Sequence, residues 1–376
     1  MRILCVIDHL GSGGAQRQLV TLACGLKQRG HEVEFFVYFP KQSFFGEPLI
    51  ANKIPLHEFS KGRGFSPGVV RKLSSLIRSV GYDVVLSYLT SPNVYAELSS
   101  IFAPSAKLVV SERASHFADR TRLGALVRRN LHRLADHIVV NSLSHRSWLI
   151  QHFPWMRGRL TTIYNGFDMR HFWPQPNPPP ERRDLRLLVV GRTDPGKNFV
   201  TLLKALQLFH AAHGWAPQLD WVGRRDDGTP AGRTHCQQLD ALLDSFPAVK
   251  QRWQWLGERS DVPGLLREHH ALIHPTFHEG LPNAICEALA GGRPVLASAV
   301  CDNGFLVPDG GRGFLFDPNS PHGIAASIDR LVTLSERDWF RMSTSARAYA
   351  EEALSIDRCV TEYENLFIKL VANDRP

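Results

Sequence analysis

The 376-residue sequence predicts an α/β fold made of two Rossmann-like, doubly wound parallel-sheet domains that face a cleft. The chain is longer than one hydrophobic core usually organises, which favours two domains. Short apolar runs alternate with helical patterns along both halves, as parallel strands joined by crossover helices require. A proline-rich stretch separates the two series of strands, so each half is expected to form a sheet of its own.

The first domain is predicted to occupy residues 1–172. Its strands are the apolar runs RILCVI, EVEFFVYF, DVVLSYL, KLVVS and HIVVNS, and the segment TTIYNGFD closes the series. Helical patterns lie between these runs, beginning with one from about Ala15 to Arg29. This repetition of strand and helix is typical of a Rossmann-like unit.

The second domain is predicted to follow a linker at residues 173–184. The stretch HFWPQPNPPPERRD, residues 171–184, holds five prolines, which prevent a continuous helix and stiffen an extended chain. Beyond it, residues 185–355 repeat the pattern with the runs LRLLVVG, QLDWVG, WQWLG, ALIHP and PVLAS. A last helical pattern lies within residues 356–376.

Composition argues against several classes of protein. With 43% hydrophobic and 21% charged residues the chain reads as globular, and no run approaches the roughly 18 to 20 apolar residues of a membrane span. The first residues, MRILCVIDHLGSGGA, read as a strand entering a glycine loop rather than as a signal peptide, so we expect a cytoplasmic protein. The six cysteines are scattered singly, which argues against disulfides and a zinc site.

Charge is divided unevenly between the halves. Residues 1–180 hold 22 Lys and Arg against 11 Asp and Glu, a net charge of +11. Residues 181–376 hold 22 against 25, a net charge of −3. The basic half predicts an anionic partner, such as nucleic acid, an acidic lipid surface or a phosphorylated acceptor, and a plain solvated surface is the alternative.

Two cations follow a buried strand of the second domain. In VVGRTDPGKN the strand ends at Gly191, Arg192 follows at once, and Lys197 stands at the start of the next helix. Strand ends of open α/β sheets line the ligand crevice, so these two side chains are placed to bracket a diphosphate. An ordinary solvated loop is the alternative.

Two carboxylates lie eight positions apart in TFHEGLPNAICEALAGGRPV, residues 276–295. Glu279 precedes a turn, and Glu287 lies in the helix that the turn opens. The turn consists of Gly280, Leu281, Pro282 and Asn283. Pro282 suits the first turn of a helix, where free amides and the helix dipole favour a phosphate oxygen. Both carboxylates could reach one cleft from different heights and accept hydrogen bonds from sugar and ribose hydroxyls, unless they are an ordinary loop and surface pair.

Glycines follow the first strand in the segment DHLGSGGAQRQL. Gly13 and Gly14 let the backbone approach a ligand closely and present amides at a helix N-terminus. A nicotinamide cofactor is not predicted, because Gln16 stands where the dinucleotide fingerprint has its third glycine, and the second strand ends without an acid for the ribose. A tight structural turn is the alternative.

These segments together resemble a known family. The stretches HPTFHEGLPNAICEALAGGRPVLAS, VVGRTDPGKN, LGSGGAQRQLVTLACGL and TTIYNGFD look like those of the retaining nucleotide-sugar glycosyltransferases of family four, which adopt the GT-B fold. The resemblance spans nearly the whole chain. It implies transfer of a hexose or N-acetylhexosamine from a nucleotide sugar, a UDP-sugar before a GDP-sugar, to a saccharide acceptor in the synthesis of cell-surface polysaccharide such as lipopolysaccharide.

The resemblance also implies a role for each motif. Arg192 and Lys197 would bind the donor diphosphate, and the glycine loop at Gly13 and Gly14 would approach it from the first domain. Glu279 would contact the transferred sugar, so that Glu279, Arg192 and Lys197 form the catalytic set. The amides from Gly280 to Asn283 would face sugar and phosphate.

Two further implications concern the rest of the chain. Glu287 would hold the ribose, and the helix after Ile356 would cross back to the first domain. No Asp-x-Asp segment exists to hold a divalent cation, so we expect neither a metal nor another cofactor. Cations and helix amides would instead stabilise the leaving diphosphate, which would help to deprotonate the acceptor on the same face.

The sequence departs from the family pattern in two places. Ser111-Glu112-Arg113 stands where many relatives have Ser-Glu-His, and His116 is the nearest replacement for the missing histidine. Phe305 lies near the position where relatives carry a glutamate. The fine geometry around the donor is therefore not fixed by the resemblance.

The acceptor is expected on the basic first domain. Six arginines lie between Arg113 and Arg133, interleaved with leucines at helical spacing. The predicted acceptor-side residues are Arg113, His116, Arg120 and Arg128. They would meet anionic lipid or the pyrophosphate of a polyprenyl-linked acceptor at the inner face of the plasma membrane, whereas the plain alternative is a helix whose apolar stripe faces the core.

Other functions explain fewer of these features. A nucleic-acid-binding protein would use the basic charge but leave the glycine loop and paired glutamates without a role, so no nucleic-acid partner is expected. A GT-B phosphorylase or a nucleotide-sugar epimerase would share the architecture, and the fold alone does not exclude them.

Overall fold

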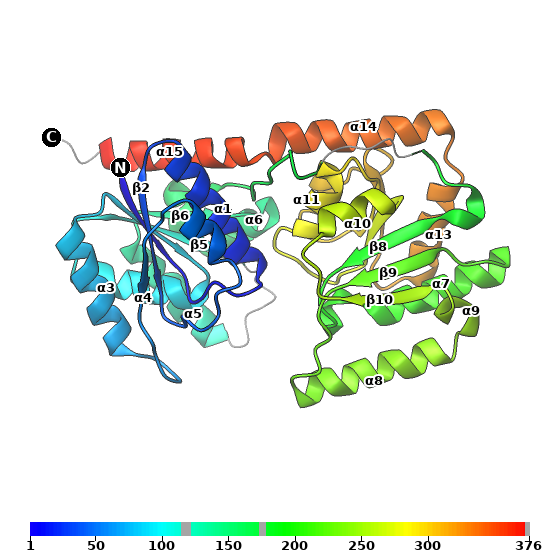
Figure 1. The fold of residues 1–376 in the computed structure, drawn as a ribbon, viewed down its shortest axis with the longest axis horizontal. Coiled ribbons are helices and arrows are strands. Elements are labelled where there is room, and N and C mark those ends of the chain that lie inside the picture. Colours follow the sequence, from blue (N-terminus) through cyan, green and yellow to red (C-terminus); the bar gives the residue numbers. More distant parts are fainter. Residues whose placement is uncertain (114–121, 173–177, 373–376) are drawn as a thin grey trace. The chain divides into compact units, whose positions relative to one another are not determined.

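Two separate parallel sheets form the framework of the molecule (Figure 1). The computed structural model describes residues 1–113, 122–172 and 178–372. The chain divides into two units, of which the first combines residues 1–166 with the segment from Ile356 onwards and the second spans residues 167–355. The boundary falls between Gly166 and Phe167, earlier than the predicted one at residue 172. The prediction of two Rossmann-like parallel-sheet domains is confirmed.

The first unit is built on a seven-stranded sheet of order β3-β2-β1-β4-β5-β6-β7, with neighbouring strands parallel. Its strands are β1 (Arg2–Val6), β2 (Glu32–Val37), β3 (Leu56–Glu58), β4 (Val84–Tyr88), β5 (Lys107–Glu112), β6 (His137–Val140) and β7 (Leu160–Thr162). Its α-helices are α1 (Gly14–Gln28), α2 (Glu47–Ala51), α3 (Pro67–Val80), α4 (Thr90–Ser100), α5 (Arg122–Leu131), α6 (Leu143–His152) and α15 (Ile356–Ala372). Two 3-10 helices, η2 (His132–Leu134) and η3 (Pro154–Arg159), complete it. The strand order reverses between β1 and β4, and ligands of open α/β sheets bind at such a switch point.

Strand β1 shows why the sheet needs continuous apolar runs. Ile3 and Cys5 pack in a core cluster with residues of α1 and α15, whereas Leu4 and Val6 pack in the opposite cluster with residues of α3, α4 and α6. Successive strand residues point to opposite faces, and both faces of this sheet are covered by helices. The run RILCVI is therefore apolar at every position that the sheet buries.

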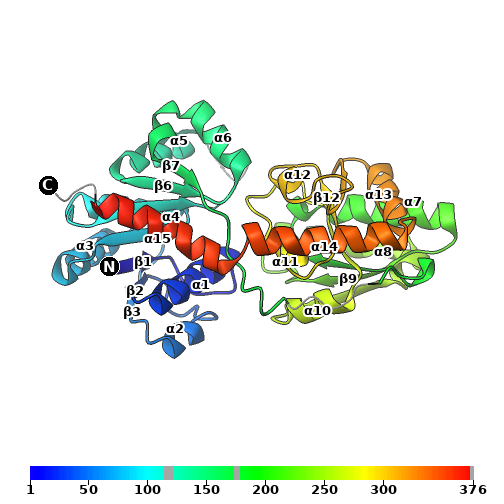
Figure 2. The ribbon, with the colours of Figure 1, turned by 90° about the horizontal axis from the view of Figure 1, so that it is seen from above.

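Helix α15 comes from the end of the chain and completes the first unit (Figure 2). It packs against α1 through the cluster that holds Tyr363 and Phe367. Glu364 accepts one hydrogen bond from Arg29 and pairs with His31, each at 2.8 Å. A segment far away in sequence thus closes the core around β1.

The second unit is built on a six-stranded parallel sheet of order β10-β9-β8-β11-β12-β13. Its strands are β8 (Arg186–Val190), β9 (Gln218–Val222), β10 (Trp253–Gly257), β11 (Ala271–His274), β12 (Val295–Ser298) and β13 (Gly313–Phe316). Its α-helices are α7 (Phe199–His213), α8 (Pro230–Asp244), α9 (Pro247–Lys250), α10 (Val262–Glu268), α11 (Asn283–Ala290), α12 (Asn303–Leu306), α13 (Pro321–Val332) and α14 (Glu336–Ala353). Two 3-10 helices, η4 (Arg182–Asp184) and η5 (Pro195–Lys197), precede and follow β8. The order reverses between β8 and β11, which places a second switch point there.

None of the helices within the described ranges is both long enough and apolar enough to cross a bilayer.

Candidate active site

The switch point of the second sheet brings the predicted catalytic residues together. Strands β8 and β11 are parallel neighbours, so the loops that follow them leave the same edge of the sheet. The loop after β8 carries Arg192 and Lys197, and the loop after β11 carries Glu279. Topology therefore joins Lys197 and Glu279, which are 82 positions apart in the chain.

A buried carboxylate lies at the centre of this site. Lys197 Nζ donates a hydrogen bond to Glu279 Oε1, and His274 Nε2 lies 3.2 Å from the same oxygen. Burial raises the pKa of Glu279, but the hydrogen bond from His274 and the charge of Lys197 outweigh it and lower the pKa to about 2. Glu279 is therefore a carboxylate at neutral pH and can accept hydrogen bonds from hydroxyl groups.

His274 was not among the predicted site residues. It ends β11 and is buried, and burial lowers its pKa, so the imidazole is neutral and its Nε2–H donates to Glu279. Its position as the last residue of the apolar run ALIH, at the carboxyl end of a strand, was the available signal.

Asn198 fixes the loop that carries Lys197. Its backbone has φ 60°, in the left-handed region that asparagine tolerates better than most residues. Its side-chain Nδ2 donates to the carbonyl oxygens of Pro275 at 2.9 Å and Pro318 at 2.7 Å. The Phe277 amide donates to Gly196 O at 2.9 Å, so the loops after β8 and β11 are tied together at two points.

The two predicted cations differ in environment. The Lys197 side chain is largely buried beside Glu279, whereas the Arg192 side chain is 63% exposed and lies 3.7 Å from Asp194. Asp194 Oδ1 accepts from the Gly196 amide at 3.0 Å and thereby shapes the turn between the two cations. Lys197 is fixed in the structure, and Arg192 extends into solvent.

The turn after Glu279 leads directly into α11. Leu281 and Pro282 are buried, and the helix begins at Asn283. The sequence predicted Pro282 in the first turn of the helix. In the structure Pro282 is the N-cap residue, just before the first turn. Because a proline side chain cannot accept a hydrogen bond, the first amides of α11 depend on other partners, which suits them to an anion. Gly280 and Asn283 lie on either side of this anchored pair.

Glu287 lies inside α11 and is only 2% exposed. Glu279 and Glu287 are therefore a loop carboxylate and a helix carboxylate, both withdrawn from bulk solvent. The expected contact between Glu287 and a ribose stays a prediction.

The glycine loop lies at the switch point of the first sheet. Gly13 is the N-cap residue of α1 and Gly14 is its first residue. A Cβ added at Gly13 would lie 2.0 Å from Gln16 Oε1, and Gln16 is held in turn by a 3.2 Å hydrogen bond to Asp8. The Gln16 side chain thus occupies the space beside Gly13, and contact of Gly13 and Gly14 with a donor stays a prediction.

Arg113 lies at the carboxyl end of β5 and is held by three groups. Its Cζ lies 3.9 Å from the centre of the Tyr88 ring, and its Nη atoms donate to Asn165 Oδ1 at 2.5 Å and Tyr363 Oη at 2.8 Å. Asn165 belongs to the segment TTIYNGFD and Tyr363 to α15. Arg113 therefore joins β5, this segment and the last helix of the unit.

A buried polar cluster surrounds the neighbouring Glu112. Its two oxygens accept from His132 Nε2 at 2.9 Å and from His145 Nε2 at 2.8 Å, and His132 Nδ1 also pairs with Glu97. Burial lowers the pKa of His132, but hydrogen bonds to both carboxylates outweigh it and raise the pKa to about 9. Burial would raise the pKa of Glu112, but its two histidine partners hold it well below the usual value. Sequence reasoning did not find this cluster, because its members come from four separate elements.

The other predicted acceptor-side residues are placed unequally. His116 and Arg120 lie outside the described residues, and Arg128 is half-buried on α5. Arg129 is buried with its guanidinium 4.7 Å from the ring centre of Trp148, while Leu126 and Val127 are exposed. Trp148 and Glu112 thus draw Arg129 inward. The apolar stripe of α5 does not face the core throughout, because Leu126 and Val127 are exposed.

In the part of the chain that the structure describes, no three His, Cys, Asp or Glu side chains are grouped so that they could hold a metal ion.

Comparisons with known protein families match most of the chain. The family model "Glycosyltransferase Family 4" matches residues 12–171, and the model "Glycosyl transferases group 1" matches residues 184–333. The first match covers the glycine loop, and the second covers the Lys197–Glu279 site.

Curated bacterial relatives are similar over part of their length. The chain is 29% identical over 213 residues to N-acetylgalactosamine-N,N'-diacetylbacillosaminyl-diphospho-undecaprenol 4-alpha-N-acetylgalactosaminyltransferase of Campylobacter jejuni, covering 53% of this chain and 57% of that protein. It is 27% identical over 224 residues to UDP-Gal:alpha-D-GlcNAc-diphosphoundecaprenol alpha-1,3-galactosyltransferase of Escherichia coli, covering 57% and 55%. The chain thus spans little more than half the length of these relatives.

Solved structures share the fold over the whole chain. The structure of HepE from Anabaena in complex with UDP and glucose superposes with a TM-score of 0.83, at 21% identity, covering 98% of this chain and all of that one. Sucrose-phosphate synthase from Thermosynechococcus elongatus superposes with a TM-score of 0.80 at 18% identity, covering 100% of both chains. At these identities the likeness shows the fold alone.

Proposed function

The chain belongs to glycosyltransferase family 4, and we propose that it moves a hexose or N-acetylhexosamine from a nucleotide sugar to a lipid-linked saccharide, with retention at the transferred carbon. The observation that carries this proposal is the Lys197–Glu279–His274 cluster at the switch point of the second sheet. It combines an ionised carboxylate for sugar hydroxyls with a fixed cation for a phosphate.

The donor is proposed to bind mainly to the second unit. Lys197 and Arg192 hold the diphosphate, and the first amides of α11 add neutral donors to the same anion. Glu279 accepts hydrogen bonds from the transferred sugar, and His274 holds Glu279 in place. Glu287 is proposed to bind the ribose. UDP is the nucleotide favoured, because HepE was crystallised with UDP and one curated relative is named for UDP-Gal.

Leaving-group stabilisation is proposed as the main catalytic effect. Negative charge develops on the diphosphate as the glycosidic bond breaks, and positive groups already in place stabilise it without reorganisation. The leaving phosphate oxygen then takes the proton of the acceptor hydroxyl on the same face of the sugar. No step of this scheme needs a metal ion or another cofactor.

The acceptor is proposed to be a saccharide linked through a diphosphate to a polyprenyl lipid. Support comes from the two bacterial relatives, because both are named for acceptors that include diphospho-undecaprenol. A peripheral position at the inner face of the plasma membrane follows from such an acceptor, and nucleic acid is not a proposed partner. The product would enter cell-surface polysaccharide synthesis.

A nucleotide screen tests the donor part of the proposal. Unfolding of the protein is followed with UDP, GDP, ADP and their sugar conjugates, because a ligand at a hundredfold its Kd stabilises by about 2.7 kcal/mol. We expect a clear rise in Tm with a UDP-sugar in wild type and a much smaller rise in Lys197→Ala. A protein that no nucleoside diphosphate stabilises would contradict the proposal.

Chelation tests the proposed independence from metals. We expect transfer activity to be largely unchanged in EDTA, while Lys197→Ala should slow turnover by on the order of 10²–10³-fold, as loss of one preorganised donor to a developing charge does. The measurement is product formation in EDTA against added magnesium or manganese. Activity that disappears in EDTA and returns with either metal would refute metal independence.

A further inference from the structure

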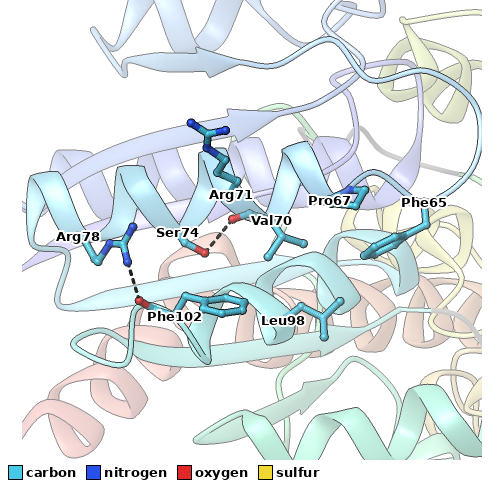
Figure 3. A pocket seen from close by; sticks show the side chains of 8 residues that line it. All are labelled: Phe65, Pro67, Val70, Arg71, Ser74, Arg78, Leu98 and Phe102. Atoms are coloured by element: carbon cyan, nitrogen blue, oxygen red, sulfur yellow. Dashed lines mark hydrogen bonds between the residues drawn. The ribbon is translucent and has the colours of Figure 1, made fainter.

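A hollow lies on the surface of the first unit between α3 and α4 (Figure 3). Its volume is about 470 Å³, within the range of roughly 300–1,000 Å³ that is common for ligand sites. Apolar side chains of Phe65, Val70, Leu98 and Phe102 line it, and Arg71 and Arg78 lie along α3 at its rim. We call this hollow the α3–α4 groove.

Large apolar side chains around the groove are open to solvent. Phe65 is 59% exposed, Phe102 is 58% exposed, and the adjoining Ile101 is 54% exposed. More than half of the surface of each of these apolar side chains is therefore in contact with water, which is unfavourable. Exposed apolar residues gathered at a hollow mark a surface that another molecule covers.

The chain segment that forms one wall of the groove carries cations and no acidic residues, and two of these cations, Arg71 and Arg78, line the groove. From Phe59 to Tyr82 the chain has five lysines and arginines and no Asp or Glu. They are Lys61, Arg63, Arg71, Lys72 and Arg78. Arg63, Arg71 and Lys72 are exposed. Arg78 is also exposed, and its Nη1 donates to Phe102 O at 3.2 Å, which places a guanidinium at the end of the groove.

We propose that the α3–α4 groove is the surface with which the protein docks on an anionic phospholipid bilayer. Phe65 and Phe102 insert among the acyl chains, while Arg71 and Arg78 bind headgroup phosphates through forked hydrogen bonds. Combined apolar and cationic contacts are what an amphiphile with an anionic head requires. The inference rests on the proposed function and deepens it, because a lipid-linked acceptor lies at a membrane.

The position of the groove supports this use. Helices α3 and α4 both begin at the carboxyl edge of the first sheet, the edge that also carries Gly13 and Glu112. The Phe65 end of the groove therefore lies at the edge where open α/β sheets bind ligands. A protein docked through the groove would hold this edge beside the lipid headgroups. Helix α5 is less suited to the task, because its Arg129 is buried.

Vesicle sedimentation tests the proposal without measuring activity. The full chain is mixed with vesicles of phosphatidylcholine alone or of phosphatidylcholine with phosphatidylglycerol, at low and physiological salt. Wild type is expected to sediment with the anionic vesicles only, and less strongly as salt rises. Arg71→Gln/Arg78→Gln should bind the anionic vesicles about tenfold more weakly or worse, since each cation near an acidic bilayer contributes measurably.

Two further variants separate the groove from overall charge. The control Arg157→Gln/Lys369→Gln removes two exposed cations of the same unit outside the groove and should bind nearly as wild type does. Phe102→Ser keeps every charge and should still lose affinity, because it removes an inserting ring. If both double variants lose vesicle affinity equally, the attraction is due to diffuse charge and the proposal is overturned. It is also overturned if wild type stays in the supernatant at low salt.

Nucleotide-induced stabilisation is measured on the same samples. Amide-exchange protection across β1, β2 and α3 is measured as well, because it shows that the first unit, which carries the groove, is folded in each variant. Absence of vesicle binding in a protein that nucleotide stabilises would overturn the docking surface alone. Vesicle binding in a protein that no nucleotide stabilises would contradict the proposed function instead.

Discussion

At the residue scale, Glu279 is kept ionised inside the protein by two neighbours with different roles. Lys197 supplies a full positive charge, whereas the neutral His274 supplies a hydrogen bond and little charge. A donor diphosphate would compete for Lys197 but leave His274 in place, so Glu279 keeps one partner throughout. The carboxylate proposed to bind the sugar and the cation proposed to bind the phosphate are thus coupled through one contact.

This coupling predicts different effects for the two glutamates. Glu279→Gln keeps the shape of the side chain but removes its charge, and it should lower turnover by on the order of 10²-fold while weakening nucleotide binding little. Glu287→Ala removes a buried carboxylate proposed to hold the ribose, and it should weaken binding of UDP by roughly ten- to a hundredfold, as loss of a charged hydrogen bond does. Titration calorimetry with UDP, beside turnover, distinguishes them, and equal losses of affinity would refute the division of roles.

Sequence reasoning located the charged residues of this site and missed the neutral ones. The charged residues stand out in the sequence because they come soon after apolar runs that predict strands. They are Arg192, Lys197 and Glu279. His274 belongs to an apolar strand, and Asn198 has a structural role that depends on carbonyls of Pro275 and Pro318. Partners so distant in the chain are known only once the loops are folded.

At the scale of elements, the cluster around Glu112 joins four segments of the first unit. Glu97 comes from α4, Glu112 from β5, His132 from η2 and His145 from α6. Two carboxylates alone would repel each other in this buried place, and a protonated His132 between them turns repulsion into attraction. Arg129 stacks on Trp148 and lies 3.8 Å from Glu112, which adds a second positive charge.

Removing His132 should therefore destabilise the first unit in a pH-dependent way. His132→Gln leaves two buried carboxylates without their shared cation, at a cost of roughly 3–5 kcal/mol near neutral pH. The folded-state pKa of about 9 lies above the ordinary 6.5, so the stabilisation is full below pH 6.5 and is lost as pH rises to 9. Urea unfolding of wild type and variant across this range measures the difference.

His137 provides the matched control for this prediction. It lies on the neighbouring strand β6, and burial lowers its pKa to about 4, so it is neutral throughout the range. His137→Gln should give a stability difference that does not change between pH 6.5 and 9. A His132→Gln difference that is equally flat would exclude a protonated His132.

The elements themselves were predicted unevenly. Long apolar runs such as RILCVI gave strands that the structure confirms, because a sheet covered on both faces needs them. Strand β3 is only Leu56–Glu58 at the sheet edge, and β13 follows a glycine-rich turn, so neither has a run that periodicity could detect. Pairing with an existing neighbour, rather than local pattern, makes these two segments strands.

At the scale of the whole molecule, each unit has its own core. The cluster on one face of the first sheet contains residues of α15, and the cluster on the other face draws only on earlier residues of the unit. The cluster of the second unit draws only on the chain between its two boundaries. The first unit therefore depends on the last helix of the chain, although the second unit lies between them in sequence. The core of the first unit is therefore complete only when the C-terminal segment packs against it.

Two matched substitutions test whether the cores are independent. Phe367 in α15 and Phe209 in α7 are both buried, and replacing either by alanine should cost roughly 3–5 kcal/mol. We expect Phe367→Ala to lower amide-exchange protection across β1, β2 and α1 while UDP still protects residues 191–198 and the start of α11. Phe209→Ala should reverse this pattern, lowering protection in the second unit and the response to UDP. If either variant lowers protection equally throughout both sheets, the two units unfold as one and the cores are not independent.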